Sequence, residues 1–169
     1  DCVSCLVGSE MCIRDSHRSA PILLETKLQA TAGQPLLFPH AAQTLQEARE
    51  RAGFGSITEL DGLETHDCFT VTEYMAIDHS GLTAPGDTWK ADEEGRIAPD
   101  GDFPINPTGA LIGLGHPVGA TGERMLLDTA PQVTGTARHY QLPRAQNMIT
   151  FNVGGSTTTC ASFVVGVGG

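Results

Sequence analysis

The chain has 169 residues, 40% of them hydrophobic, and a formal net charge of −10. This length favours a single domain with its own hydrophobic core. The negative charge argues against nucleic acids and anionic membranes as partners, and no apolar run approaches the roughly 20 residues of a membrane-spanning helix.

The segment at residues 1–16 has neither a helical nor a strand pattern and does not join smoothly to the sequence that follows. It resembles the translated adapter sequence that occurs in assembled environmental reads. We therefore expect residues 1–16 to be a non-native leader and exclude them from the predicted fold; a genuine protein segment is the alternative. Residues 17–34 are then the remnant of a preceding linker or domain, and residues 35–169 form the folded domain.

The five cysteines are unevenly spread. Cys2, Cys5 and Cys12 lie in the first dozen residues, whereas Cys68 and Cys160 stand alone. Cys2 and Cys5 have the spacing of half a zinc site, but no second pair with ligand spacing follows. Free thiols in a cytoplasmic protein without a metal are the simpler expectation.

The first half of the domain predicts two helices and a strand. Apolar residues recur at helical spacing over residues 41–52, which a glycine follows. Residues 57–65 contain a short predicted strand. A second helix is predicted over residues 69–80, with Asp67 as a candidate N-cap and Gly81 as the stop.

The second half begins with a segment rich in proline, glycine and aspartate. Residues 82–109 predict a long loop, with Trp89 as an anchor that packs it down. A third helix is predicted over residues 119–129, and strands over 147–153 and 157–167, joined by a tight glycine-containing connection. This order of elements indicates a mixed α/β layer structure.

The octapeptide GHPVGATG at residues 115–122 is the most informative motif. Gly115 and Pro117 place His116 at a backbone corner, and Gly119 follows within a helix start of small residues. Proline is favoured at the first helical position, and exposed N–H groups there bind an oxyanion. The positive helix end disfavours imidazolium, so we expect a neutral His116 that donates from one nitrogen. A rigid turn with an incidental histidine is the alternative.

A second group, His66-Asp67-Cys68, lies where the predicted strand ends and a helix begins. Sites in α/β sheets gather at such carboxyl ends. In the first helical turn the helix dipole stabilises a thiolate, which suits Cys68 as a nucleophile or proton shuttle. The alternatives are a small buried hydrophobe for Cys68 and a core histidine for His66. Together with His116 these residues contain metal-ligand types, but sequence neighbours do not converge easily on one ion.

The third group is Asn152-Val153-Gly154-Gly155. Gly154 lets a backbone N–H approach a ligand closely, as an oxyanion-hole donor must. A simple hairpin turn is the alternative. Cys160 lies within a predicted strand and is expected in the core.

Together these motifs resemble the C-terminal half of a thiolase, over about residues 35–167. The octapeptide is a specific motif of that family. His66-Asp67-Cys68-Phe69 is similar to the thiolases related to sterol carrier protein 2, as is Asn106-Pro107-Thr108-Gly109, although Ala110 stands where that subgroup usually has a second glycine. The resemblance implies an α/β fold, a βαβαββ unit that is one half of a five-layered αβαβα structure.

The resemblance also implies roles for individual residues. The family's nucleophilic cysteine lies in the other half, which this chain lacks. His116 matches the histidine that activates this cysteine and helps form one oxyanion hole, and Gly154 matches the N–H donor of a second. His66 stands where many thiolases have an asparagine that holds the catalytic water. Asn152 replaces the usual acid/base cysteine, whose function Cys68 then supplies.

The implied activity is that of an acetyl-CoA C-acyltransferase, in thiolysis of 3-ketoacyl-CoA or in Claisen condensation, with this half inactive alone. Coenzyme A thioesters are the expected substrates, and no covalently bound cofactor is expected. The missing N-terminal half and, in the intact enzyme, a second copy as a homodimer are the expected partners. The alternatives are a thiolase-like aldolase acting on a steroid or acyl-CoA side chain, and a non-catalytic module that binds acyl-CoA or lipid.

Overall fold

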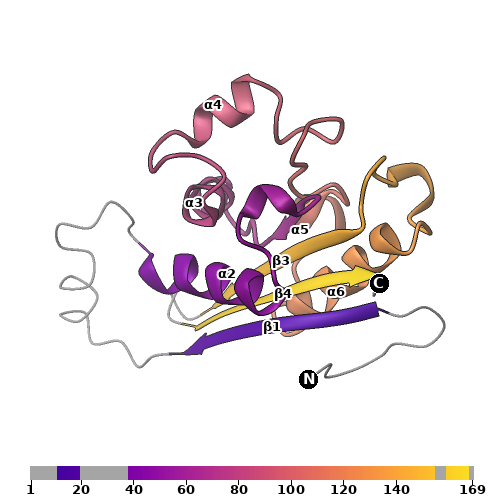
Figure 1. Ribbon diagram of the computed structural model, residues 1–169, viewed down its shortest axis with the longest axis horizontal. Helices are drawn as coiled ribbons and strands as arrows, with labels where there is room; N and C mark the ends of the chain where they lie inside the picture. Colours follow the sequence, from indigo (N-terminus) through magenta and orange to yellow (C-terminus); the bar gives the residue numbers. More distant parts are fainter. Residues whose placement is uncertain (1–10, 20–37, 155–158, 168–169) are drawn as a thin grey trace.

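The computed structural model describes residues 11–19, 38–154 and 159–167 (Figure 1). Within these ranges one sheet has the strand order β1-β4-β3-β2. Its strands are β1 (Met11–Ser19), β2 (Leu63–Thr65), β3 (Asn147–Gly154) and β4 (Thr159–Val167). β2 is parallel to β3, and β4 is antiparallel to β1 and β3. Three strands therefore point the same way, with β4 reversed among them.

Helices cover both faces of this sheet. They are α2 (Pro39–Arg51), α3 (Thr70–Ser80), α4 (Thr88–Glu93), α5 (Ala110–Leu114) and α6 (Thr121–Val133), with short 3-10 turns at Ile57–Glu59 and Arg138–Tyr140. α2 packs on β1 and β4, whereas α6 packs on β2, β3 and β4 and lies behind the sheet in Figure 1. The element order contains the predicted βαβαββ succession, with α4 and α5 added, and the α/β fold class is confirmed.

Two hydrophobic clusters lie on opposite sides of the sheet. Ile149 and Val164 belong to the larger cluster, which includes residues of α2 and α3. Their sequence neighbours Met148 and Val165 belong to the smaller cluster beneath α6. Successive residues of a strand point to opposite faces of the sheet. Consecutive residues of β3 and of β4 are both buried because helices cover both faces.

The predicted helices and strands are largely confirmed, but several begin or end at other residues than predicted. Residues 57–65 form a 3-10 turn followed by a strand of only three residues. α3 has Phe69 as its N-cap rather than Asp67, and Phe69 is 69% exposed. Gly81 ends this helix in the left-handed conformation, as predicted.

The long segment at residues 82–109 contains α4 and is not an uninterrupted loop. Trp89, the predicted anchor, lies on α4 and is 48% exposed. Phe103 is the buried aromatic side chain of this segment, at 2% exposure. We predicted Trp89 because it is the largest aromatic residue of the segment. Phe103 has no polar atom in its side chain that needs a hydrogen-bond partner, so its burial costs less free energy.

Residues 11–16, which we excluded from the predicted fold, are part of the sheet in the structure. They lie in β1, with Met11 opposite Val167 and Ser16 opposite Ser162 on β4. Backbone hydrogen bonds define this antiparallel pairing, so a strand forms without an alternating side-chain pattern. The division into residues 1–16, 17–34 and 35–169 stays a prediction.

Ala110 has a φ of 54°, in the left-handed region that favours glycine, and its side chain is 7% exposed. This conformation costs an L-residue about 1–2 kcal/mol. We expect Ala110→Gly to leave the free energy of unfolding unchanged or to raise it by up to about 1 kcal/mol. Relief of backbone strain raises this free energy, and loss of the buried methyl group lowers it. Urea unfolding of the two proteins measures the change.

Ala76→Gly is the matched control for this substitution. Ala76 is buried within α3, at 3% exposure. There the same change should lower the free energy of unfolding by about 1–2 kcal/mol. Equal losses at positions 76 and 110 would contradict the strain at Ala110.

Candidate active site

The predicted site residues gather at one edge of the sheet. His66 and Cys68 follow β2, and Asn152 and Gly154 lie at the end of β3. Because β2 and β3 are parallel, their carboxyl ends meet at the same edge. Residues 66 and 152, far apart in the sequence, therefore become neighbours.

Direct contacts join His66, Asn152 and His116. The Nδ1 atom of His66 lies 2.9 Å from Oδ1 of Asn152. Since an amide oxygen only accepts, Nδ1 of His66 is the donor, and Nε2 is the unprotonated nitrogen of the neutral ring. The ring of His66 meets the ring of His116 edge to face, with centroids 4.9 Å apart and planes at 82°.

His116 is oriented by Thr121, the first residue of α6. Its Nδ1 lies 2.7 Å from Oγ1 of Thr121, and that hydroxyl donates to the carbonyl oxygen of Pro117 at 3.2 Å. A threonine hydroxyl has one hydrogen, so Nδ1 of His116 must donate to it. The neutral ring then keeps a lone pair on Nε2, which is the atom available to accept a proton from a thiol.

Burial sets the electrostatics of His66, whose side chain is 6% exposed. Removal from water lowers the pKa of His66 below its usual value, and the nearby His116 lowers it further. The hydrogen bond that His66 donates to Asn152 and the charge of Asp67 oppose this change. His66 is therefore held neutral more firmly than a histidine in water.

Cys68 lies apart from this network. It precedes the N-cap Phe69, so it is outside the first turn of α3, contrary to the prediction. Its thiol is exposed, and its Sγ lies 3.9 Å from Oγ1 of Thr72. Among the described residues no hydrogen bond joins Cys68 to His66 or His116. Cys160, in contrast, is fully buried as predicted, and burial raises the pKa of its thiol to about 11.

The backbone of the octapeptide differs from the predicted helix start. Gly115 has a φ of 86°, which makes the predicted corner before His116. The carbonyl of Pro117 accepts from the N–H groups of Ala120 and Thr121, so a turn containing Gly119 separates Pro117 from α6. Pro117 is therefore not the first helical residue. Gly154 is exposed at the end of β3, and the connection predicted at 154–156 extends outside the described residues.

Gly122 has no side chain, and the amide of Asn152 lies where a side chain at this position would be. A Cβ atom at position 122 would lie 2.7 Å from Nδ2 of Asn152. We expect Gly122→Ala to displace this amide from His66 and so to lower the pKa of His66 further, because the hydrogen bond now raises it. Proton NMR titration of the histidine rings measures the change.

The control for Gly122→Ala is Gly119→Ala in the same octapeptide, where an added Cβ meets no atom within 4 Å. This variant should leave the His66 titration unchanged. Alanine is the better helix former, so Gly122→Ala should not lose more than about 1 kcal/mol of stability. An unaltered His66 titration in Gly122→Ala would show that Asn152 does not hold the ring.

The sequence analysis missed Glu64, which lies in β2 and is 1% exposed. Its Oε1 accepts from Oγ1 and N of Thr108, at 2.9 and 3.3 Å. Burial is the main cause that raises the pKa of Glu64 to about 7, and the negative charge of Asp128 adds to it. A carboxylate in the middle of a short buried strand was the available signal.

Neighbouring contacts tie the same segments together. Oδ1 of Asn106 accepts from the N–H of Thr65 at 2.7 Å, and the N–H of Asn106 donates to the carbonyl of Leu63 at 2.8 Å. The Asn-Pro-Thr-Gly motif at residues 106–109 therefore has a structural function here. It holds the strand that ends just before His66.

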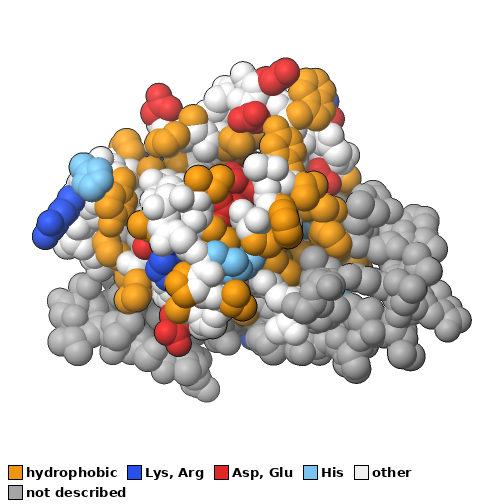
Figure 2. All heavy atoms as spheres, turned by 180° about the vertical axis from the view of Figure 1, so that it is seen from behind, with side chains coloured by type: hydrophobic (Ala, Val, Ile, Leu, Met, Phe, Trp, Pro, Cys, Tyr) orange, Lys and Arg blue, Asp and Glu red, His pale blue; other side chains and the backbone are white. Residues whose placement is uncertain are grey.

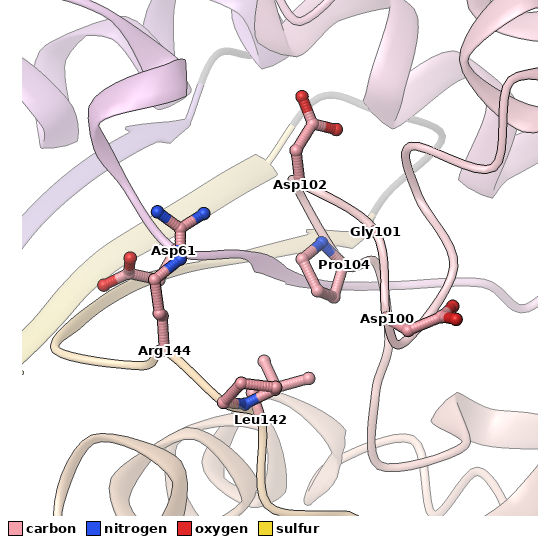
Figure 3. A pocket seen from close by; sticks show the side chains of 8 residues that line it. Asp61, Asp100, Gly101, Asp102, Pro104, Leu142 and Arg144 are labelled. Carbon is pink, nitrogen blue, oxygen red and sulfur yellow. The ribbon is translucent and has the colours of Figure 1, made fainter.

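A separate pocket of about 330 Å³ lies elsewhere on the surface (Figure 3). Asp61, Asp100, Asp102 and Arg144 are among its lining residues, and none of the predicted site residues lines it. Across the described ranges, no three His, Cys, Asp or Glu side chains are grouped as a metal site would require. No described helix is both long and apolar enough to cross a membrane.

Several hydrophobic residues close to His66 and His116 in the sequence are exposed on the surface. The most exposed of those near His66 and His116 along the chain are Phe69, Val71, Ile112, Leu114 and Val118, at 69%, 59%, 84%, 53% and 83% exposure. Figure 2 shows a face of the molecule on which histidine lies among hydrophobic side chains.

Fold and site together define an α/β domain with paired imidazoles at the carboxyl edge of its sheet. Residues 25–167 match the profile of the thiolase C-terminal domain-like family, and the chain belongs to this family. It is 35% identical over 120 residues to an acetyl-CoA acetyltransferase of Methanothermobacter thermautotrophicus, covering 70% of this chain and 31% of that protein. It is 32% identical over 117 residues to sterol carrier protein 2 of Bos taurus, covering 69% and 21%.

More distant similarities extend this picture. The chain is 27% identical over 100 residues to benzoylsuccinyl-CoA thiolase subunit BbsB of Thauera aromatica, covering 59% of this chain and 26% of that protein. A solved structure of an Ltp2-ChsH2(DUF35) aldolase matches with a TM-score of 0.75 and 15% identity, covering 93% of this chain and 39% of that one. Identity this low shows a shared fold alone. The chain spans less than a third of the length of the first two relatives.

Proposed function

We propose that this chain supplies the C-terminal part of the active site of an acyl-CoA thiolase. The observation that supports this most directly is the contact of His66 with both Asn152 and His116 at the carboxyl edge of the sheet. Membership of the thiolase family and similarity to an acetyl-CoA acetyltransferase support the same reaction class. The substrates would be 3-ketoacyl-CoA and free coenzyme A.

In this proposal His116 acts through Nε2, which takes the proton of a cysteine thiol in the missing N-terminal half. The resulting thiolate attacks the 3-keto carbon, and the bond between C2 and C3 breaks. The exposed thiol of Cys68 gives its proton to the C2 carbanion, which leaves as acetyl-CoA. The thiolate of Cys68 then takes the proton of the free coenzyme A thiol, and the coenzyme A sulfur attacks the acyl-enzyme and accepts the acyl group. The released cysteine thiolate recovers its proton from Nε2 of His116, which restores both residues.

Oxyanions form twice in this sequence and need donors that are already in place. We assign the first to the protonated Nε2 of His116 and to a water held by His66, and the second to the N–H of Gly154. Asn152, which hydrogen-bonds Nδ1 of His66, has no thiol and serves to orient that ring. Acyl-CoA is bound as substrate, and no covalently attached cofactor is needed.

The exposed hydrophobic residues support a covering partner. Phe69, Val71, Ile112, Leu114 and Val118 are large hydrophobic residues that are all exposed, and clustered exposed apolar residues mark interaction sites. We propose that the N-terminal half of the enzyme covers part of this surface, and that the intact enzyme is a homodimer. This chain alone is then expected to be inactive.

The test uses the intact enzyme that contains this chain, purified from a complete copy of the gene. We expect it to convert acetoacetyl-CoA and coenzyme A into acetyl-CoA, and to show no cleavage without coenzyme A. Cleavage of a 3-hydroxyacyl-CoA in the absence of coenzyme A would instead establish the aldolase, whose fold this chain shares. Saturable acyl-CoA binding without turnover would establish a binding module.

A further inference from the structure

The segment that positions His116 has almost no packing to hold it. Every residue from Ile112 to Ala120 is exposed. Exposed turns keep one conformation only when hydrogen bonds at their ends fix them. The contact of His116 with Thr121 fixes the end nearer α6. The other end, at α5, needs a support of its own.

Asp67 supplies that support from the strand side of the site. Its Oδ1 accepts a hydrogen bond from the N–H of Leu111 at 3.0 Å, and both side chains are buried, at 5% and 7% exposure. The carbonyl of Leu111 accepts from the N–H of Gly115 at 2.8 Å. A continuous series of hydrogen bonds thus runs from Asp67 through Leu111 to the residue before His116.

Asp67 also follows His66 directly in the chain. One residue therefore joins both members of the histidine pair, His66 by the peptide bond and His116 by the hydrogen bonds through Leu111. The pair is sensitive to small movements, because edge-to-face contacts between rings depend on their mutual angle. Burial strengthens the bond to Asp67, since a carboxylate acceptor away from water binds an N–H more strongly than a neutral acceptor does.

We propose that Asp67 is a positioning residue, which sets the contact between the rings of His66 and His116 through its hydrogen bond to Leu111. In this role Asp67 acts through Leu111 and not on the substrate. The importance of this contact for catalysis rests on the proposed thiolase function. The geometry itself is tested without turnover.

The experiment compares Asp67→Ala and Asp67→Asn with the unaltered chain, labelled with 15N and 13C. Asn retains an oxygen that accepts from Leu111, whereas Ala has none. We expect Asp67→Ala to lose the nuclear Overhauser effect between the His66 and His116 rings, and its Leu111 amide to exchange at least tenfold faster. Asp67→Asn should retain both signals.

Asp61→Ala is the matched control. Oδ2 of Asp61 accepts from the N–H groups of Gln146 and Asn147, at 2.8 and 2.9 Å, and lies outside the site. This variant loses two bonds of the same kind, so it reports on destabilisation alone. It should retain the ring contact between His66 and His116.

A folded Asp67→Ala variant that keeps the inter-ring signal would overturn the proposal. If that variant does not fold, the test uses the unaltered chain. A scalar coupling between Leu111 N and Asp67 Cγ should then be measurable across their hydrogen bond. Absence of this coupling would also overturn the proposal. In the intact enzyme, Asp67→Ala should lower kcat with little change in KM, and Asp67→Asn should restore it. Absence of turnover in every protein, including the unaltered one, would refute the proposed function and leave the NMR result standing.

Discussion

Replacing His116 by alanine should lower kcat of the intact enzyme by about 10²–10⁴-fold, the usual loss when a general acid–base group is removed. Nε2 of His116 is the nitrogen left free by the hydrogen bond to Thr121, and alanine offers no atom to take the thiol proton. The measurement is steady-state thiolysis of acetoacetyl-CoA. Circular dichroism should show an intact fold, because His116 lies in an exposed turn.

His139→Ala is the matched control for this experiment. His139 is also an exposed histidine, and its ring packs edge to face on Tyr140 with centroids 5.0 Å apart. It lies in a 3-10 turn that contains no proposed site residue. We expect its kcat to stay near that of the unaltered enzyme. A His116→Ala enzyme with kcat within threefold of the His139→Ala enzyme would remove His116 from the mechanism.

Glu64→Gln should stabilise the chain at high pH and have little effect at low pH. The pKa of Glu64 rises from 4.5 to about 7 on folding. The folded state therefore binds more protons than the unfolded state between these values, and the stability that Glu64 contributes is lost as pH rises through 7. Each pKa unit corresponds to about 1.4 kcal/mol, so Glu64→Gln should be more stable by about 3 kcal/mol at pH 8.

The glutamine oxygen can still accept both hydrogen bonds from Thr108, which makes Glu64→Gln nearly isosteric. The measurement is urea unfolding of both proteins from pH 4 to pH 8, with the difference plotted against pH. The other ionisable groups are present in both proteins, so their contribution cancels in the difference. Glu93→Gln, at an exposed position on α4, is the control and should give a small difference throughout. A difference for Glu64→Gln that does not grow with pH would refute the burial of its charge.

Local patterns determined much of the fold. The spacing of apolar residues predicts α2, and the hydrophobic runs near the C-terminus predict β3 and β4. Gly81 ends α3 as predicted, in the left-handed conformation, and Gly115 makes the predicted corner with a positive φ of 86°. These features depend on a few neighbouring residues, and a sequence contains such information directly.

Features that depend on distant partners were not predictable in the same way. β1 exists through backbone pairing with β4, which lies at the other end of the chain, with Met11 opposite Val167. Asp67, predicted as a cap for α3, instead accepts from Leu111. Glu64 is buried because Thr108 and α6 enclose it, which no local pattern states.

The sequence by itself predicted the members of the candidate site, namely His66, Cys68, His116, Asn152 and Gly154, because each belongs to a short contiguous motif. The tertiary structure decided which of them meet. Parallel pairing of β2 and β3 brings His66 to Asn152, and the turn after α5 brings His116 to His66. Among the described residues Cys68 hydrogen-bonds neither ring, and its thiol instead lies near Thr72 of α3. Which side chains meet at this edge is a property of strand pairing and of the hydrogen bonds between segments, and these join residues far apart in the sequence.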